Sequence, residues 1–412
     1  MLREPSEETS IARKDFFTAS FLIFNALLWY YMSKNAVIDS LLSILNVTYT
    51  QNIIILTACY AAIIVSGIVG SILSSKISRL KFLYFWMILG AVSSSLPVLF
   101  SGFTVTHALV ISILLGASFG LGIPSCFAYF ADCTLIENRG KIGGITLLFT
   151  NLSAPLFVIL CGMFDLKVNS LIFVAWRASG LIAFFFLKPK ERIISETKRK
   201  TTFISILRSR SFILFFIAWL MFNLIDSFET PILDHIFEDF QYILIAPVIG
   251  SFFTLIAGLL CDQVGRKLVV LYGFVSMGIA YAIIGIAPAA LFPRYFFLTT
   301  ESVSWAIFYV TFLLILWGDL SQPGNREKYY VIGVVPSFLT EIVSTLSTSY
   351  VLQIPQTSAF SLASFFLFLA VLPLLYAPET LPERKIELRR LRRYVDEAKK
   401  LQQKYAEKTA RK

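Results

Sequence analysis

The chain has 412 residues, of which 57% are hydrophobic, 15% aromatic and only 15% charged. A soluble protein has about 25% charged residues and could not bury so much apolar surface, so the composition excludes a cytosolic enzyme and indicates a membrane protein. The formal net charge of +10 raises the question of a nucleic-acid partner, which the positions of the basic residues must answer.

The chain begins with a polar segment of mixed charge, residues 1–15, whereas a cleavable signal sequence has a short basic region before an apolar stretch. We therefore expect the first apolar run to be retained. Twelve runs have the roughly 20 apolar residues that a helix needs to cross about 30 Å of hydrocarbon, and barrel strands would be half as long and alternate in polarity. The predicted helices cover residues 16–32, 52–73, 82–100, 107–130, 142–164, 168–187, 211–231, 241–261, 268–288, 295–317, 329–350 and 358–376.

Of the 36 Lys and Arg residues, 32 lie in the leader, the tail and alternate loops between the predicted spans. The other four are Lys34, Lys167 and Arg294, in the opposite loops, and Arg177, inside a span. Because basic residues concentrate on the cytoplasmic side, we predict a multi-pass protein of the cell membrane with both termini in the cytoplasm. This asymmetry accounts for the net positive charge, so we expect no nucleic-acid partner.

The five cysteines lie inside apolar runs or at their ends, without a C-x-x-C pair or a neighbouring His. This arrangement predicts neither disulfides nor a metal site. The chain also lacks the G-x-x-x-x-G-K-[ST] phosphate-binding motif and the H-E-x-x-H zinc motif. We therefore expect no cofactor and no enzymatic activity, including that of an ATP-driven pump.

An internal repeat relates the two halves of the chain. The loops after the fourth and tenth spans share polar positions at an offset of 187, among them Asp132 with Asp319 and Arg139 with Arg326. We therefore predict an all-α membrane protein of twelve transmembrane helices in two six-helix bundles related by pseudo-two-fold symmetry. The predicted units are an N-terminal bundle over 1–187, a cytoplasmic basic linker over 188–210, a C-terminal bundle over 211–377 and a cytoplasmic basic amphipathic tail over 378–412.

Three segments resemble the major facilitator superfamily of transporters. Segment 116–140 is similar to span 4 and the following loop of that family's sugar porter and metabolite:proton symporter branches, and residues 378–380 are similar to their P-E-T sequence. The first-half copy of the family's loop signature has Ser74 and Ile77 at its Asp and Gly positions. The second-half copy fits the pattern G-x-x-x-D-x-x-G-R-K with Gly258, Asp262, Gly265, Arg266 and Lys267.

The resemblance implies alternating access, in which two bundles rock about a central site. It assigns Asp262 a contact with a helix end of the facing bundle, and it places Arg266 and Lys267 at the inner gate and on the phosphates of anionic lipids. The alternative for these two basic residues is that they only fix the topology. Four loop residues of the repeat are either secondary gate residues or ordinary, individually weak ion pairs, namely Asp132, Arg139, Asp319 and Arg326.

Ionisable side chains inside the predicted spans are costly in lipid and usually face a cavity or a partner. Polar residues recur every three or four positions around Asp226 and Glu341, so each set forms a stripe on one helix face. Removal from water favours the protonated form of a carboxylate, so either residue is the expected proton carrier. The alternatives are a static pair of Arg177 with Glu341 and a merely hydrated Glu229. The predicted substrate or proton pathway comprises Asn223, Asp226, Glu301, Glu341 and Arg177.

These observations favour a secondary active transporter that moves a small solute, such as a metabolite, organic ion or sugar, by alternating access with proton symport. We expect it to work as a monomer, with anionic lipids at its cytoplasmic face. The alternatives are a proton-driven antiporter that exports drugs or metabolites and a transporter-like receptor that transports nothing. Four aromatic residues are expected to contact the substrate, namely Trp29, Tyr30, Trp219 and Trp305.

Overall fold

The computed structural model of the chain describes residues 13–187, 201–237 and 245–382, together with residues 387, 391 and 395. Every regular element within these ranges is a helix, and twelve spans are long and apolar enough to cross a membrane. The predicted all-α fold with twelve transmembrane helices is therefore confirmed. The predicted leader, most of the linker and most of the amphipathic tail lie outside the described residues.

The first half of the chain contains six spans. The first of them is continuous from α1 through η1 to α2, because the backbone passes through one π-helical turn without leaving the helix. The elements are α1 (Arg13–Ser33), η1 (Lys34–Ile38), α2 (Asp39–Ile44), α3 (Tyr49–Leu73), α4 (Arg79–Leu99), α5 (Val105–Asp132), α6 (Arg139–Gly162) and α7 (Leu166–Leu187).

The second half begins with a short helix and then contains six further spans. A second π-helical turn, η3, lies within its fourth span, between α12 and α13. The elements are α8 (Phe203–Leu207), α9 (Arg210–Leu233), α10 (Ala246–Gln263), α11 (Arg266–Ile286), α12 (Leu291–Phe308), η3 (Tyr309–Ile315), α13 (Leu316–Leu320), α14 (Arg326–Val351) and α15 (Gln356–Tyr376).

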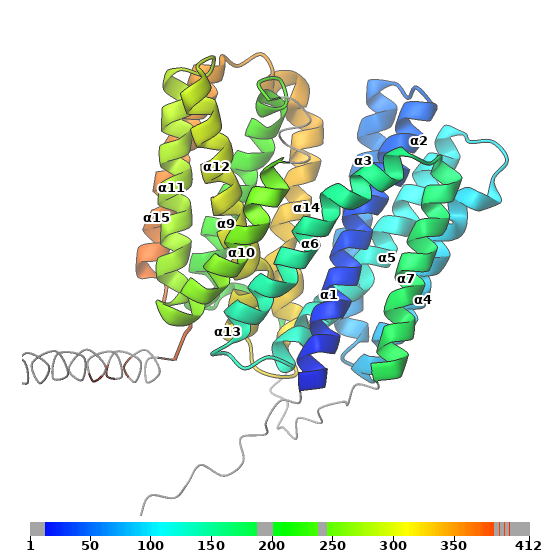
Figure 1. Cartoon of the computed structure of the whole chain (residues 1–412), viewed down its shortest axis with the longest axis horizontal. Coiled ribbons are helices and arrows are strands. Elements are labelled where there is room, and N and C mark those ends of the chain that lie inside the picture. The colour runs from blue at the N-terminus through cyan, green and yellow to red at the C-terminus, as the bar shows by residue number, and fades with distance from the viewer. Residues whose placement is uncertain are drawn as a thin grey trace, which may run out of the picture.

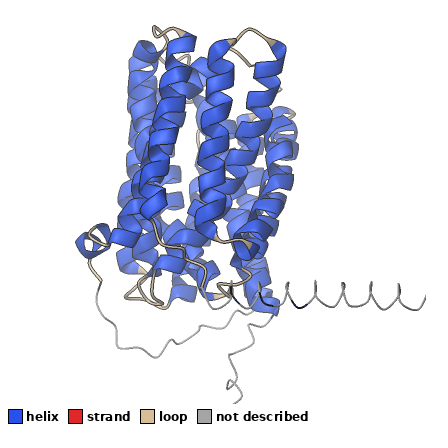
Figure 2. Cartoon of the chain, turned by 90° about the vertical axis from the view of Figure 1, so that its left-hand side faces the viewer, coloured by secondary structure: helices blue, strands red, loops and turns tan. Residues whose placement is uncertain are grey.

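The two sets of six spans lie side by side, and their axes run in a common direction (Figures 1 and 2). Two helix pairs form the most extensive contacts between the halves, since α6 packs along α10 and α3 packs along α14. The α6–α10 crossing is close, because a Cβ atom added to Gly140 or Gly258 would come within 3.0 Å of the other residue's carbonyl oxygen. Small residues at such a crossing let helix backbones approach in lipid.

The predicted end of the first span, at residue 32, was wrong, because the helix continues to Ile44. The polar residues Lys34 and Asn35 interrupt the apolar run, but both are only half-buried and lie on the π turn. The next three residues, 36–38, are buried and hold the turn against the bundle. Because the backbone groups stay hydrogen-bonded within the helix, two polar side chains at this point do not end it.

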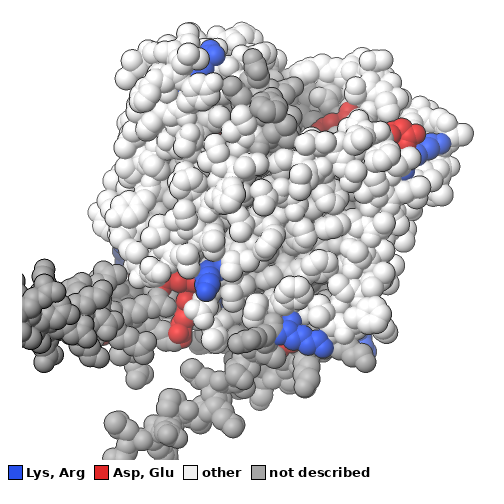
Figure 3. All heavy atoms as spheres, viewed as in Figure 1, with Lys and Arg blue, Asp and Glu red and all other residues white. Residues whose placement is uncertain are grey.

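Four loops with acidic and basic residues lie at one end of the molecule, the lower end in Figure 1. We call it the charged end and define it as residues 74–79, 132–141, 262–267 and 319–328. In Figure 3 the belt between this end and the opposite one carries almost no charged side chain on the visible face. Such a belt is what contact with hydrocarbon requires, since a charge there is costly.

Candidate functional site

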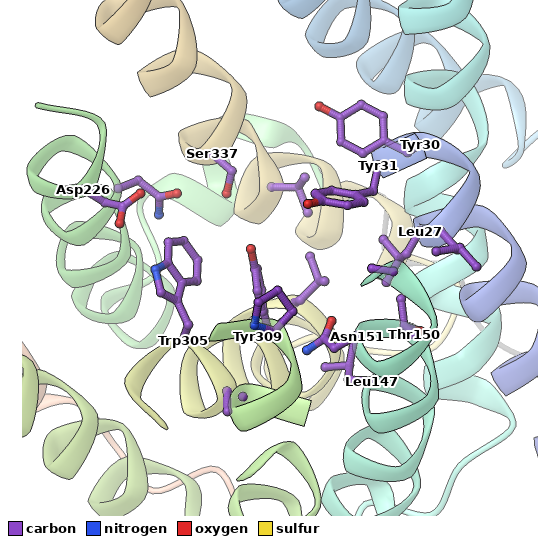
Figure 4. A pocket seen from close by; sticks show the side chains of 18 of the residues that line it. Leu27, Tyr30, Tyr31, Leu147, Thr150, Asn151, Asp226, Trp305, Tyr309 and Ser337 are labelled. Atoms are coloured by element: carbon purple, nitrogen blue, oxygen red, sulfur yellow. The ribbon is translucent and has the colours of Figure 1, made fainter. Parts of the chain in front are cut away.

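A cavity of about 420 Å³ lies between the two halves of the molecule (Figure 4). The first half contributes side chains of α1, α5 and α6, and the second half contributes those of α9, α10, α12, η3 and α14. Its volume lies within the roughly 300–1,000 Å³ that small-molecule sites occupy. The cavity is therefore large enough for a small organic solute.

Three carboxylates line the cavity, and each comes from a different helix of the second half. They are Asp226 on α9, Glu301 on α12 and Glu341 on α14, and Asn223 lies beside Asp226. No Lys, Arg or His is among the described residues that line it. The structure thus brings together four of the five predicted pathway residues. Glu229, one turn along α9, is only 6% exposed, so the expectation that it is hydrated was wrong.

Two of the cavity carboxylates lie close to aromatic side chains that carry a hydrogen-bond donor. The indole of Trp305 lies beside Asp226 within the second half. The hydroxyl of Tyr60 on α3 donates to Oε2 of Glu341 at 3.2 Å, which connects the first half to the second. The Glu341 contact therefore depends on the position of one half relative to the other, whereas the Asp226 contact does not.

Aromatic rings form much of the remaining cavity wall. Tyr30 stacks on Phe119 with ring centroids 4.1 Å apart, and Phe338 meets Tyr30 edge to face at 5.8 Å. On the other side Trp305 lies against Tyr309, with ring centroids 4.7 Å apart. The first cluster joins helices of both halves, so ring packing also holds the halves in their present arrangement.

The sequence placed four aromatic residues at the substrate, and two of them line the cavity. Tyr30 and Trp305 do so, whereas Trp29 and Trp219 are buried inside their own halves. The indole N–H of Trp29 donates to Ser94 Oγ at 2.8 Å, and that of Trp219 donates to the Gly333 carbonyl at 3.0 Å. Both tryptophans therefore pack helices together.

Arg177 on α7 is fully buried in the first half and does not line the cavity. Its Nη1 donates to Asn25 Oδ1 at 2.7 Å, and its guanidinium lies 4.8 Å and 4.2 Å from the ring centroids of Trp29 and Trp86. Within the described chain, its Nε and Nη2 make no hydrogen bond. The pair of Arg177 with Glu341 that the sequence left open is absent from the described residues.

At the charged end, the four loop residues of the internal repeat pair crosswise between the halves. Asp132 of the first half pairs with Arg326 of the second, and Asp319 of the second pairs with Arg139 of the first. Each acid is thus bonded to the arginine of the opposite half, as the exchange of two equivalent loops by a two-fold axis requires. The Arg139 and Asp319 side chains are 1% and 0% exposed, so this pair is not an ordinary surface contact.

Asp262 joins α10 to the first half by capping α6. Its Oδ1 accepts from the Gly140 backbone N–H at 3.0 Å, and its Oδ2 accepts from that of Lys141 at 2.7 Å. Carboxylates stabilise helix N-termini in this way. The fully buried Arg266 adds contacts to Asp319, with Nε to Oδ2 at 3.2 Å, and to the Ile136 carbonyl of the first half.

Glu379 fixes the start of α11 where Gly265 makes the turn. The Gly265 φ angle of 121° lies in the region that favours glycine, and an added Cβ would collide with the Glu379 carboxylate. That carboxylate accepts from the backbone N–H groups of Arg266 at 2.9 Å and Lys267 at 3.1 Å. Lys267 Nζ donates to the Leu375 carbonyl at 2.6 Å, so the side chain binds α15.

Several contacts involve residues that were not singled out from the sequence. Arg79 contacts both Asp132 and Glu327, the latter through Nε at 2.8 Å, and Tyr60 reaches Glu341. An offset of 188, which aligns Gly70 with Gly258, also places Arg79 opposite Lys267 in the repeat, and this position is the sequence signal that could have indicated its importance. Segment 116–120 reads G-A-S-F-G, which matches the pattern of a hydrolase nucleophile. It lies inside α5, however, whereas that motif requires a strand-to-helix turn.

These contacts close the molecule at the charged end. At the opposite end, the outline in Figure 3 dips between the two halves, and acidic side chains lie in the dip. The cavity is thus shut off below by ion pairs, a capped helix and the glycine crossing of α6 with α10.

Comparison with known proteins points to one family. The family model described as Major Facilitator Superfamily matches residues 16–318. A crystal structure of the human organic anion transporter MFSD10 (TETRAN) is similar over 90% of this chain and 100% of that one, with a TM-score of 0.69 and 14% identity. The proton:xylose symporter XylE, bound to 6-bromo-6-deoxy-D-glucose, is similar over 89% and 96%, with a TM-score of 0.66 and 17% identity. No curated protein matches the sequence.

Proposed function

The chain belongs to the major facilitator superfamily, and on this premise we propose that it is a secondary active transporter that couples the movement of a small solute to protons by symport. The observation that carries the proposal is the cavity between the halves, with three carboxylates and no basic side chain among its described lining residues. A site of this kind inside a membrane needs protons or a ligand to offset its charge.

The charged end faces the cytoplasm in this proposal, because the basic residues of the sequence concentrate in its loops and in the two terminal segments. The present arrangement is then the state that admits solute from outside. In the opposite state the crosswise ion pairs at the charged end separate, and the halves close at the other end. One chain supplies both halves and the cavity, so it works as a monomer, with anionic lipid beside its cytoplasmic loops.

Glu341 is the proposed proton carrier, and Asp226 and Glu301 complete the proton and solute site. Glu341 receives its hydrogen bond from Tyr60 of the other half. Rocking of the halves changes that contact, which ties the charge of Glu341 to the conformation of the protein. Arg177 has no part in this pathway, because it lies among Asn25, Trp29 and Trp86 away from the cavity.

The solute is a metabolite, an organic ion or a sugar, and the direction of its coupling to protons has one alternative. The similarity of the fold to XylE, a proton:xylose symporter, supports symport, whereas an antiporter that exports its solute would use the same carboxylates alternately for proton and solute. A receptor that transports nothing would not move the solute across the membrane, whatever gradient is imposed.

Uptake into proteoliposomes tests the proposal. The full-length protein is reconstituted, a pH gradient is imposed, and accumulation of organic acids, sugars and organic cations is measured by mass spectrometry. Symport predicts accumulation on the side that protons enter, and loss of it in Glu341→Gln. The matched control is Asp165→Asn, since Asp165 caps α7 far from the cavity and Asn can cap equally well. Gradient-driven uptake that persists in both Glu341→Gln and Asp226→Asn would refute the carrier assignment.

A further inference from the structure

We infer that the cavity binds an organic cation, with the carboxylates of the second half holding its positive charge and the aromatic rings enclosing its apolar part. This inference rests on the proposed function only in taking the same cavity as the transport site. It goes further by naming the class of solute that the side chains select.

The charge inside the cavity is one-sided. Asp226, Glu301 and Glu341 line it, and no basic side chain does so among the described residues. Glu229 adds a fourth acid one turn from Asp226; it is 6% exposed, and its Oε2 makes no hydrogen bond within the described chain. Like charges that line one cavity repel one another, and a bound cation relieves that repulsion.

One basic side chain of the first span, Lys34, lies on a different part of that span from the residues that line the cavity. Lys34 lies on η1, interacts electrostatically with Asp39 and lines a small side cavity of about 10 Å³ rather than the main one. It is therefore not among the described side chains that line the main cavity. An anionic solute there would be buried beside three carboxylates with no basic side chain among the described lining residues, which is unfavourable.

The cavity wall also has the chemistry that organic cations prefer. In Figure 4 Trp305 and Tyr309 reach in from the second half, and Tyr31 reaches in from the first half opposite them. A cation within about 6 Å of such a ring is attracted by the electrons of the ring face. The carboxylate of Asp226 lies against Trp305, so one bound cation can contact an acid and a ring together.

Each part of such a solute therefore has a matching group of side chains in the cavity wall. The charged group lies against Asp226 and Glu301 on the second half, which leaves Glu341 to carry the proton. The apolar body lies against Tyr30, Phe119 and the other rings near the first half. A small uncharged sugar would satisfy neither feature, because it brings no charge and little apolar surface.

Equilibrium binding without any gradient tests the inference apart from transport. Tritiated N-methyl-4-phenylpyridinium is bound to the full-length protein in nanodiscs at pH 7.5. Its displacement is measured with neutral 4-phenylpyridine and anionic 4-phenylbenzoate, which have nearly the same shape. The cation should bind at least about tenfold more tightly than the neutral compound, equivalent to about 1.4 kcal/mol, and the anion should not compete. Tetraethylammonium and spermidine serve as two further cations.

Variants locate the site. Asp226→Asn and Glu301→Gln should each reduce the preference for cation over neutral compound about tenfold, whereas Asp165→Asn should leave it unchanged. Trp305→Phe should reduce it less, because a ring face remains. The ratio of two affinities is the measured quantity, and a general loss of folded protein would not change it.

The outcomes separate this inference from the proposed function. Selective cation binding without gradient-driven uptake of any solute keeps the cation site and overturns the transport proposal. Gradient-driven uptake of sugars or organic acids, with none of the three cations bound below about 1 mM, keeps the transporter and overturns the cation site. Equal affinity for charged and neutral compounds, or an unchanged ratio in both carboxylate variants, also overturns it.

Discussion

Replacement of Asp319 by Asn should open the charged end. The Asp319 side chain is fully buried and interacts with Arg139, Arg266 and the hydroxyl of Thr380. Asn keeps the shape but removes the charge and one acceptor oxygen, so the buried Arg139 loses its counter-ion and Arg266 keeps only its ion pair with Asp262. We therefore expect the closed arrangement to lose free energy relative to the open one.

The size of the effect depends on the hydrogen bonds that the two arginines retain in the variant. Loss of one partner from a buried ion pair costs about 3–5 kcal/mol. Arg139 still donates to the Ala131 carbonyl at 2.6 Å, and Arg266 still donates to the Cys261 carbonyl at 3.3 Å, so the lower value of about 3 kcal/mol applies. A difference of that size shifts the ratio of closed to open molecules about 100-fold.

The assay is a distance measurement between spin labels on the two halves, at Ser75→Cys and Gln322→Cys. Both positions are exposed at the charged end, and the five native cysteines are buried, so the labels select the introduced thiols. Asp319→Asn should lengthen the distance, and Asp132→Asn should do the same through the reciprocal pair with Arg326. Asp165→Asn is the control. A distance distribution unchanged in both variants, with the protein still folded, would refute the gating argument.

Two further predictions concern side chains away from the charged end. Arg177→Met should raise the unfolding temperature or leave it unchanged, since an apolar side chain of similar length replaces a buried charge without a counter-ion; a fall of more than about 2 °C, roughly 2 kcal/mol for a chain of this length, would contradict this. Tyr60→Phe should slow gradient-driven uptake several-fold at unchanged unfolding temperature, because it removes only the hydrogen bond to Glu341; wild-type uptake rates would contradict this.

Hydropathy and spacing predicted the twelve spans and singled out four residues that line the cavity, because both signals depend on composition along a single helix. Lipid requires long apolar runs, and Asp226, Glu301 and Glu341 stood out as costly charges within them. Arg177 stood out for the same reason, but the face on which it lies depends on the rotation of α7 within the bundle. The sequence gives depth in the membrane, whereas the packing of Trp29 and Trp86 around the guanidinium decides its direction.

The internal repeat revealed the loop residues but not their partners. An offset of 187 aligns Asp132 with Asp319 and Arg139 with Arg326, and each acid precedes an arginine in its own loop. Pairs within each loop would have fitted the sequence equally well. The crosswise exchange appears only when the two halves are placed together, because it depends on the distance between loops from different halves.

That exchange makes the closure cooperative. Because both acids pair with the opposite half, separation of the halves breaks both pairs at once, together with the contact of Asp262 with the start of α6. We therefore expect that no single contact is lost gradually while the others remain, and that the charged end has two arrangements rather than a continuous range. A solute or proton in the cavity can reverse the preference only by the difference in its affinity for the two arrangements. Tyr60, which reaches Glu341 from the other half, is the contact through which such a difference would arise.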